Sequence, residues 1–116
     1  MKHTLTKDLG NVRLEDVAVP LLPLHSIVIP ALCMGRIVHG LVMVTDWDNE
    51  DEPSWVCLIS EPNTLTTHGL WIESGPVYDG EIITTVFNLT NVEKRIRKTD
   101  VVSRLVRIPG AMWKAL

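Results

Sequence analysis

This chain of 116 residues has few cysteines and few aromatic residues: two cysteines, one tyrosine, one phenylalanine and four tryptophans. No CxxC pair or close Cys/His pair occurs, so the sequence predicts no zinc site. Cys33 and Cys57 each lie in an apolar run, and we expect two buried free thiols. The histidines are widely spaced, and we expect them in loops or at the surface rather than on a metal. They are His3, His25, His39 and His68.

Long apolar runs are also absent. A transmembrane helix needs about 18 or more apolar residues in succession, so we expect no membrane partner. The polar first ten residues lack the hydrophobic stretch of a signal peptide, which predicts a cytoplasmic or virion location rather than secretion. The formal net charge of −3 makes nucleic acid an unlikely partner on global charge alone.

The chain shows no long 3.6-residue periodicity. Short β-rich runs separated by Pro, Gly, Asn and Asp predict an all-β fold, with residues 1–116 as a single domain. Within it, residues 1–11 are expected to be a flexible N-terminal segment and residues 109–116 a C-terminal tail. The predicted strands are residues 12–19, 26–30, 35–44, 54–60, 66–72, 81–88, 94–96 and 101–108.

The predicted strand 81–88 is apolar on both sides. One face would carry Ile83, Thr85 and Phe87, and the other Ile82, Thr84 and Val86. Neither face is strongly polar, so we expect a central strand that is covered on both sides. The residues 88–91 are expected to form the loop of a hairpin whose second arm is residues 92–96.

Two segments carry candidate partner contacts. Residues 46–52 hold five carboxylates in seven positions, which predicts a solvated loop because clustered like charges repel one another. Trp47 lies within this acidic loop as a candidate contact residue. Three apolar residues near the C-terminus are expected to be buried, either by their own domain or by a neighbouring subunit. They are Met112, Trp113 and Leu116.

A basic edge is formed by Lys94, Arg95, Arg97 and Lys98. No aromatic side chain is interleaved with these cations to stack on bases, so the pattern favours a solvated edge strand. The alternative is a nucleic-acid or nucleotide-binding module, which would add Arg104 and Arg107 to the same surface.

Five motifs then follow one another in a recognisable order. They are Ile27-Val-Ile-Pro30, Thr67-His-Gly-Leu70, Gly75-Pro-Val-Tyr-Asp-Gly-Glu-Ile82, Val86-Phe-Asn-Leu89 and Lys98-Thr-Asp-Val-Val-Ser-Arg-Leu-Val106. In order and spacing they resemble the core of the dUTPase / dCTP deaminase family. The resemblance implies a distorted jelly-roll β-barrel, assembled as a homotrimer with sites between subunits.

The chain departs from that family at the positions of its catalytic and phosphate-binding residues. Glu61 stands where the resemblance implies a phosphate-binding arginine, and a carboxylate repels phosphate. Arg104 replaces a glutamine, and the loop that would hold the catalytic aspartate is shortened. If the chain is an enzyme, the resemblance implies Asp79 as the water-activating base, supported by Glu81 and Tyr78, with Mg²⁺ as the only cofactor.

Together these departures favour a protein without catalytic activity or cofactor. The sequence predicts a non-catalytic dUTPase-fold structural or interaction protein of viral or phage type, such as a capsid-decorating trimer or a host-factor binder. Its partners would be copies of itself and another protein or viral assembly. A diverged dUTP or dCTP pyrophosphatase or deaminase is the alternative.

Overall fold

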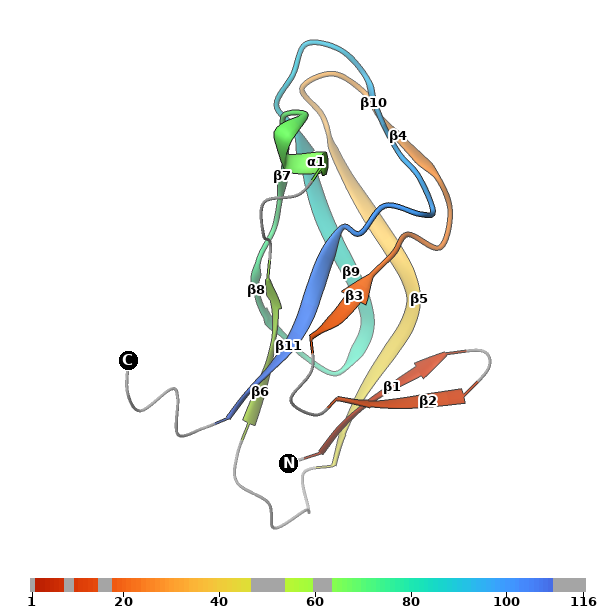
Figure 1. Ribbon diagram of the computed structural model, residues 1–116, viewed down its shortest axis with the longest axis vertical. Coiled ribbons are helices and arrows are strands. Elements are labelled where there is room, and N and C mark those ends of the chain that lie inside the picture. The colour runs from red at the N-terminus through yellow and green to blue at the C-terminus, as the bar shows by residue number, and fades with distance from the viewer. Residues whose placement is uncertain (1, 8–9, 15–17, 47–53, 60–63, 110–116) are drawn as a thin grey trace.

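The computed structural model describes residues 2–7, 10–14, 18–46, 54–59 and 64–109, and these are mostly β-strand (Figure 1). The strands are β1 (Lys2–Lys7), β2 (Gly10–Leu14), β3 (Val19–Leu21), β4 (Ile27–Ile29), β5 (Met34–Asp46), β6 (Ser54–Ile59), β7 (Leu70–Ile72), β8 (Gly75–Val77), β9 (Gly80–Asn88), β10 (Lys94–Ile96) and β11 (Ser103–Pro109). Within this part of the chain, α1 (Thr64–Thr67) is the only helix. The prediction of an all-β fold in one compact domain is confirmed.

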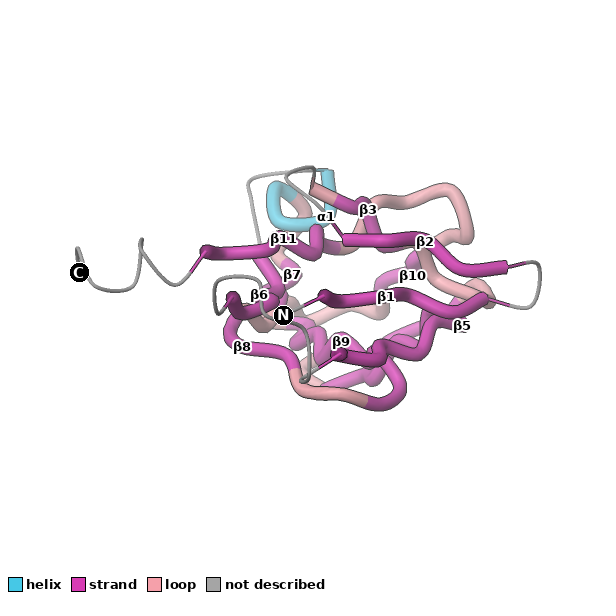
Figure 2. Tube along the Cα trace, turned by 90° about the horizontal axis from the view of Figure 1, so that it is seen from below, coloured by secondary structure: helices cyan, strands magenta, loops and turns pink. Residues whose placement is uncertain are grey.

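The strands form three antiparallel sheets. The five-stranded sheet has the order β2-β1-β5-β9-β7, the four-stranded sheet β3-β11-β6-β8, and the two-stranded sheet β10-β4. The β4–β10 pair lies near one end of the long axis and the β1–β2 hairpin toward the other (Figure 1). Viewed along that axis, β3 and β11 lie on the opposite side of the molecule from β5 and β9 (Figure 2).

Two apolar clusters form the core, and strands β5 and β9 contribute to both. The first cluster lies between the five-stranded and four-stranded sheets and contains Leu21, Leu41, Met43, Val56, Leu58, Ile82 and Leu105. The second is shared with the two-stranded sheet and contains Ile29, Ile37, Leu65, Leu70, Ile72, Val86, Ile96 and Val102. Because β5 and β9 pair with each other, one strand pair connects the two clusters.

The length of β5 depends on a bulge. Its pairing with β9 shifts register between Val38 and Val42, where Gly40 has a φ of 69°. A residue at this φ is strained unless it is glycine, and a Cβ here would lie 3.2 Å from a methyl carbon of Leu24. The bulge lets β5 bend while odd-numbered residues on both sides of it, such as Ile37 and Met43, remain buried.

The expected hairpin between residues 81–88 and 92–96 is wrong, because β10 pairs with β4 instead of β9. The side chain of Asn88 explains this. It is buried at the end of β9, and its amide nitrogen donates to the carbonyl oxygens of Ile29, Pro30 and Val92 at 2.9–3.1 Å. Its Oδ1 accepts from the backbone N–H and the hydroxyl of Thr90. Asn88 therefore joins the end of β4 to the loop that leads into β10.

Other segments also differ from the sequence-based expectation. The predicted strand 66–72 begins as α1 and becomes β7 only after Gly69, whose φ of 86° suits a residue that ends a helical turn. The predicted strand 12–19 is divided between β2 and β3, which belong to different sheets. In the expected N-terminal segment, β1 pairs with both β2 and β5.

The two cysteines are free, as expected, but they are not both buried. Cys57 is buried in β6, whereas Cys33 is exposed in the turn before β5. The prediction of two buried thiols is therefore wrong for Cys33. Its apolar neighbour Leu32 is also exposed, which shows that this apolar run is a surface turn rather than a core strand.

We expect Asn88→Asp to lower the free energy of unfolding by about 3 kcal/mol. The carboxylate can still accept from Thr90, but it would face three carbonyl oxygens without a proton to donate. Urea unfolding followed by circular dichroism measures the change. Asn91→Asp is the matched control, since Asn91 is exposed in the same loop. Equal stability of the two variants would contradict a structural role for the Asn88 side chain.

Candidate functional site

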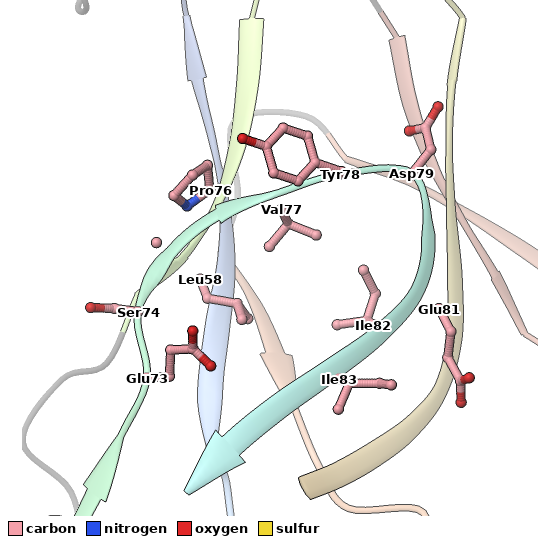
Figure 3. Close-up of a pocket in the computed structure, with 11 residues that line it drawn as sticks. Leu58, Glu73, Ser74, Pro76, Val77, Tyr78, Asp79, Glu81, Ile82 and Ile83 are labelled. Atoms are coloured by element: carbon pink, nitrogen blue, oxygen red, sulfur yellow. The ribbon is translucent and has the colours of Figure 1, made fainter.

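The loop between β8 and β9 forms the wall of a cleft of about 370 Å³ (Figure 3). It is lined by Leu58, Glu73, Ser74, Gly75, Pro76, Val77, Tyr78, Asp79, Glu81, Ile82 and Ile83. Gly80 begins β9 with a φ of 120°, which permits the sharp change of direction after Asp79. The structure thus brings Tyr78, Asp79 and Glu81 to one cleft, as their positions in the sequence suggest.

Asp79 is held in place by β5. The hydroxyl of Thr45 donates to its Oδ1 at 2.6 Å, and Thr45 itself is buried. This bond crosses from the inner side of β5 to the loop and fixes the carboxylate at the rim of the cleft. Asp79 therefore has a defined structural role, and its proposed role as a base stays a prediction.

The other polar groups of the cleft do not converge on Asp79. In Figure 3 the carboxylates of Asp79 and Glu81 point away from each other, with Glu73 on the far side of the apolar lining. Glu81 is exposed opposite Val42 on β5, and the Tyr78 side chain is 76% exposed. Within the described residues no group of three or more His, Cys, Asp or Glu side chains is placed to hold a metal ion.

The charge of the cleft opposes phosphate binding. Of the lining residues in the described part of the chain, three carry carboxylates, Glu73, Asp79 and Glu81, and none is a lysine or arginine. A nucleoside triphosphate needs fixed cationic donors around its phosphates. Arg104 and Arg107, which the nucleic-acid or nucleotide-binding alternative added to the basic surface, lie on β11.

Several predicted contact residues lie outside the described part of the chain. These are Trp47 with most of its acidic loop, and Met112, Trp113 and Leu116 in the C-terminal tail. Glu61 lies outside it as well. The described residues include the whole basic edge, with Lys94 and Arg95 in β10 and Arg97 and Lys98 in the turn that follows.

The sequence did not predict the buried polar network around His39. His39 is only 7% exposed, so its expected place in a loop or at the surface is wrong, while His25 and His68 are exposed. The signal was present in the sequence, because His39 alternates with Ile37 and Leu41 in a strand whose odd-numbered residues face inward.

The tautomer of His39 follows from its partners. The carbonyl of Leu22, 2.8 Å from Nδ1, can only accept, so Nδ1 carries the proton. Nε2 then accepts from the hydroxyl of Thr84 at 2.7 Å, and the Thr84 oxygen lies 3.5 Å from that of Ser103. This network connects β5, β9 and β11 across the core, and its side chains, those of His39, Thr84 and Ser103, are not among the described lining residues of the cleft.

Burial affects two titratable groups. Desolvation lowers the pKa of His39, against a smaller opposing effect from its bond to the Leu22 carbonyl. Desolvation also raises the pKa of Cys57, which disfavours its thiolate form. Neither His39 nor Cys57 is among the described residues that line the cleft.

No protein-family model matches the chain, and no curated protein matches it. The resemblance to the dUTPase / dCTP deaminase family stays a prediction. In the described residues no helix is long and apolar enough to cross a membrane. Function must therefore be inferred from the geometry of the surfaces.

We expect protonation of His39 to destabilise the fold. Its pKa is lower in the folded chain than in the unfolded chain, so the unfolded state takes up the proton first. Its contribution to stability is complete above about pH 6.5 and is lost as the pH falls below that value. Urea unfolding at about pH 7.5 and about pH 5.5 should show a smaller loss of stability in His39→Gln than in the wild type. His68→Gln is the control and should retain the wild-type loss; an unchanged loss in His39→Gln would refute this role.

We expect no hydrolysis or deamination of dUTP or dCTP in the presence of Mg²⁺, and no rise in melting temperature with either nucleotide. The reason is the acidic lining of the cleft and the divergence of its carboxylates. A malachite-green assay coupled to inorganic pyrophosphatase measures the pyrophosphate released by hydrolysis, and an ammonia-release assay measures deamination. Turnover that Asp79→Asn abolishes, while Glu73→Gln retains it, would instead assign Asp79 as the base of a diverged enzyme.

Proposed function

We propose that the chain is a non-catalytic structural or interaction protein that assembles with copies of itself through the outer face of its five-stranded sheet. The outer face is formed by the side chains of β5, β7 and β9 that point away from the core. They are Met34, Arg36, Val38, Val42, Val44, Trp71, Glu81, Ile83, Thr85 and Phe87. The observation that supports the proposal is the apolar character of this face.

A row of large apolar side chains crosses three neighbouring strands. Trp71 of β7 pairs in register with Phe87 of β9, and Phe87 pairs with Met34 of β5. The rings of Trp71 and Phe87 are 5.3 Å apart, centre to centre. Trp71 nevertheless remains 52% exposed. Apolar side chains gathered in this way on a surface are typical of an interface.

The row continues along the sheet. Ile83 lies opposite Val38, and Val42 and Val44 follow on β5 beyond the bulge. Ile83, Val42 and Val44 are all exposed. Strand β9 is an interior strand of its sheet, as predicted, but the described residues fully cover only one of its faces. A partner bound to the outer face would cover the second face of β9, which the sequence of this strand predicts to be buried.

A second copy of the chain suits the charges on this face. Among its side chains that the structure describes, there is one cation, Arg36, and one anion, Glu81, both exposed. Around the three-fold axis of a trimer, the cation of each copy can approach the anion of the next copy, so that neither charge is left buried without a partner. Burial of the remaining apolar area then provides most of the association free energy.

The arrangement we propose is a homotrimer of jelly-roll β-barrels. It is supported by the resemblance of residues 27–106 to the dUTPase / dCTP deaminase family and by the three antiparallel sheets around a shared core. A viral or phage particle, with the trimer as a decorating or host-factor-binding protein, is the setting that we propose for it. The acidic cleft supports the non-catalytic part of the proposal.

We expect the wild type to be a trimer at about 20 µM, and Ile83→Glu to dissociate it, because a buried unpaired carboxylate costs several kcal/mol. Light scattering after gel filtration measures the mass. Ile59→Glu is the matched control: Ile59 is 38% exposed, against 40% for Ile83, but lies on β6 of the four-stranded sheet. A monomeric wild type, or equal dissociation by both substitutions, would refute assembly through the outer face.

A further inference from the structure

A second hollow lies beside the two-stranded sheet, away from the acidic cleft. It has a volume of about 560 Å³ and is lined by Ser26, Arg95, Arg97, Lys98 and Thr99. We call it the basic pocket. Three of its five lining residues are cations and the other two carry hydroxyl groups, so every lining side chain can donate a hydrogen bond to an anion.

The backbone holds these donors together. Ile96 is fully buried and pairs with Ile27, which anchors β10 to the core. Arg95 and Arg97 flank Ile96 in the chain, so alternation turns both away from the core, and both are exposed. Ser26 directly precedes β4 and so lies beside Arg97 at the end of the strand pair.

The turn after β10 fixes the other side of the pocket. The backbone N–H of Arg97 donates to Oδ2 of Asp100 at 2.7 Å, and the N–H of Asp100 donates to the carbonyl of Arg97 at 3.0 Å. These reciprocal bonds close a tight turn with Lys98 and Thr99 at its tip. The Asp100 carboxylate is bound to the backbone and does not line the pocket.

The chemistry of the lining matches phosphoryl groups. Planar guanidinium groups bind phosphate oxygens with paired N–H donors, a lysine adds a point charge, and hydroxyl groups complete the set. Among the described lining residues there is no carboxylate to compete with such a ligand, in contrast to the acidic cleft. The same residues include no aromatic side chain, so they offer a nucleobase no stacking surface.

The geometry points to a binding site for a compact ligand that carries two or three phosphoryl groups. The net charge of −3 opposes a long polyanion, which would extend from the pocket over an acidic molecule. A compact ligand interacts mainly with the three local cations. This site is separate from the outer face, so its occupancy does not depend on self-assembly.

Inorganic tripolyphosphate is the probe, and isothermal titration at about 50 mM salt measures its binding. We expect the wild type to bind it, and Arg97→Gln to bind roughly tenfold more weakly because one charge-assisted contact is lost. Lys94→Gln is the control: it removes the same charge three residues earlier, in β10, but Lys94 is not among the lining residues of the pocket. It should change the affinity by less than about threefold.

A thymidine oligonucleotide of ten residues tests whether the phosphoryl groups belong to a nucleic acid rather than to a compact ligand. It should bind more weakly than tripolyphosphate. Tighter binding of the oligonucleotide would overturn the compact ligand, and absence of tripolyphosphate binding by the wild type would overturn the site. Equal weakening by Arg97→Gln and Lys94→Gln would also overturn it. Ser26→Asp places a repelling charge in the pocket from outside the strand pair and should abolish binding, which tests the site independently if Arg97→Gln does not fold.

Discussion

The pairing of β5 with β9 is the interaction on which the rest of this structure depends. These strands are the longest neighbours in the five-stranded sheet, and their inner side chains supply both apolar clusters of the core. The same pair carries the buried histidine on β5 and, at the end of β9, the asparagine that binds the two-stranded sheet. Loss of this pairing would separate all three sheets.

Much of this central region could be predicted from the sequence. The strands from 26–30 to 101–108 were placed near their true positions, since alternation and turn residues are local signals. The wrong hairpin has a physical cause, which is that the partner of a strand is set by contacts far away in the chain. Residues 88–96 have the composition of a hairpin, but the buried Asn88 amide binds carbonyl groups near residue 30 and directs the chain toward β4.

The functional surfaces were predicted less completely. The sequence correctly predicted that Tyr78, Asp79 and Glu81 lie close together, since they are near one another in the chain. It could not show that the carboxylates of Asp79 and Glu81 point away from each other, because side-chain directions depend on how the loop folds. Trp71 was not singled out, because three residues of strand give little alternation to interpret. The basic edge was identified by its composition. Its arrangement with Ser26 as a pocket depends on the pairing of β10 with β4, which local sequence did not reveal.

The buried polar groups also help to determine which side chains form the outer face. A slip of one residue between β5 and β9 would turn every side chain of the slipped strand to the opposite side of the sheet. His39 and Thr84 resist such a slip, since each would lose its buried hydrogen-bond partner. The register that keeps these polar groups inside is the same register that places Ile83 and Phe87 outside. The pairing of β7 with β9 then sets Trp71 beside Phe87, so the apolar outer face follows from the same hydrogen-bonded strands that hold the core.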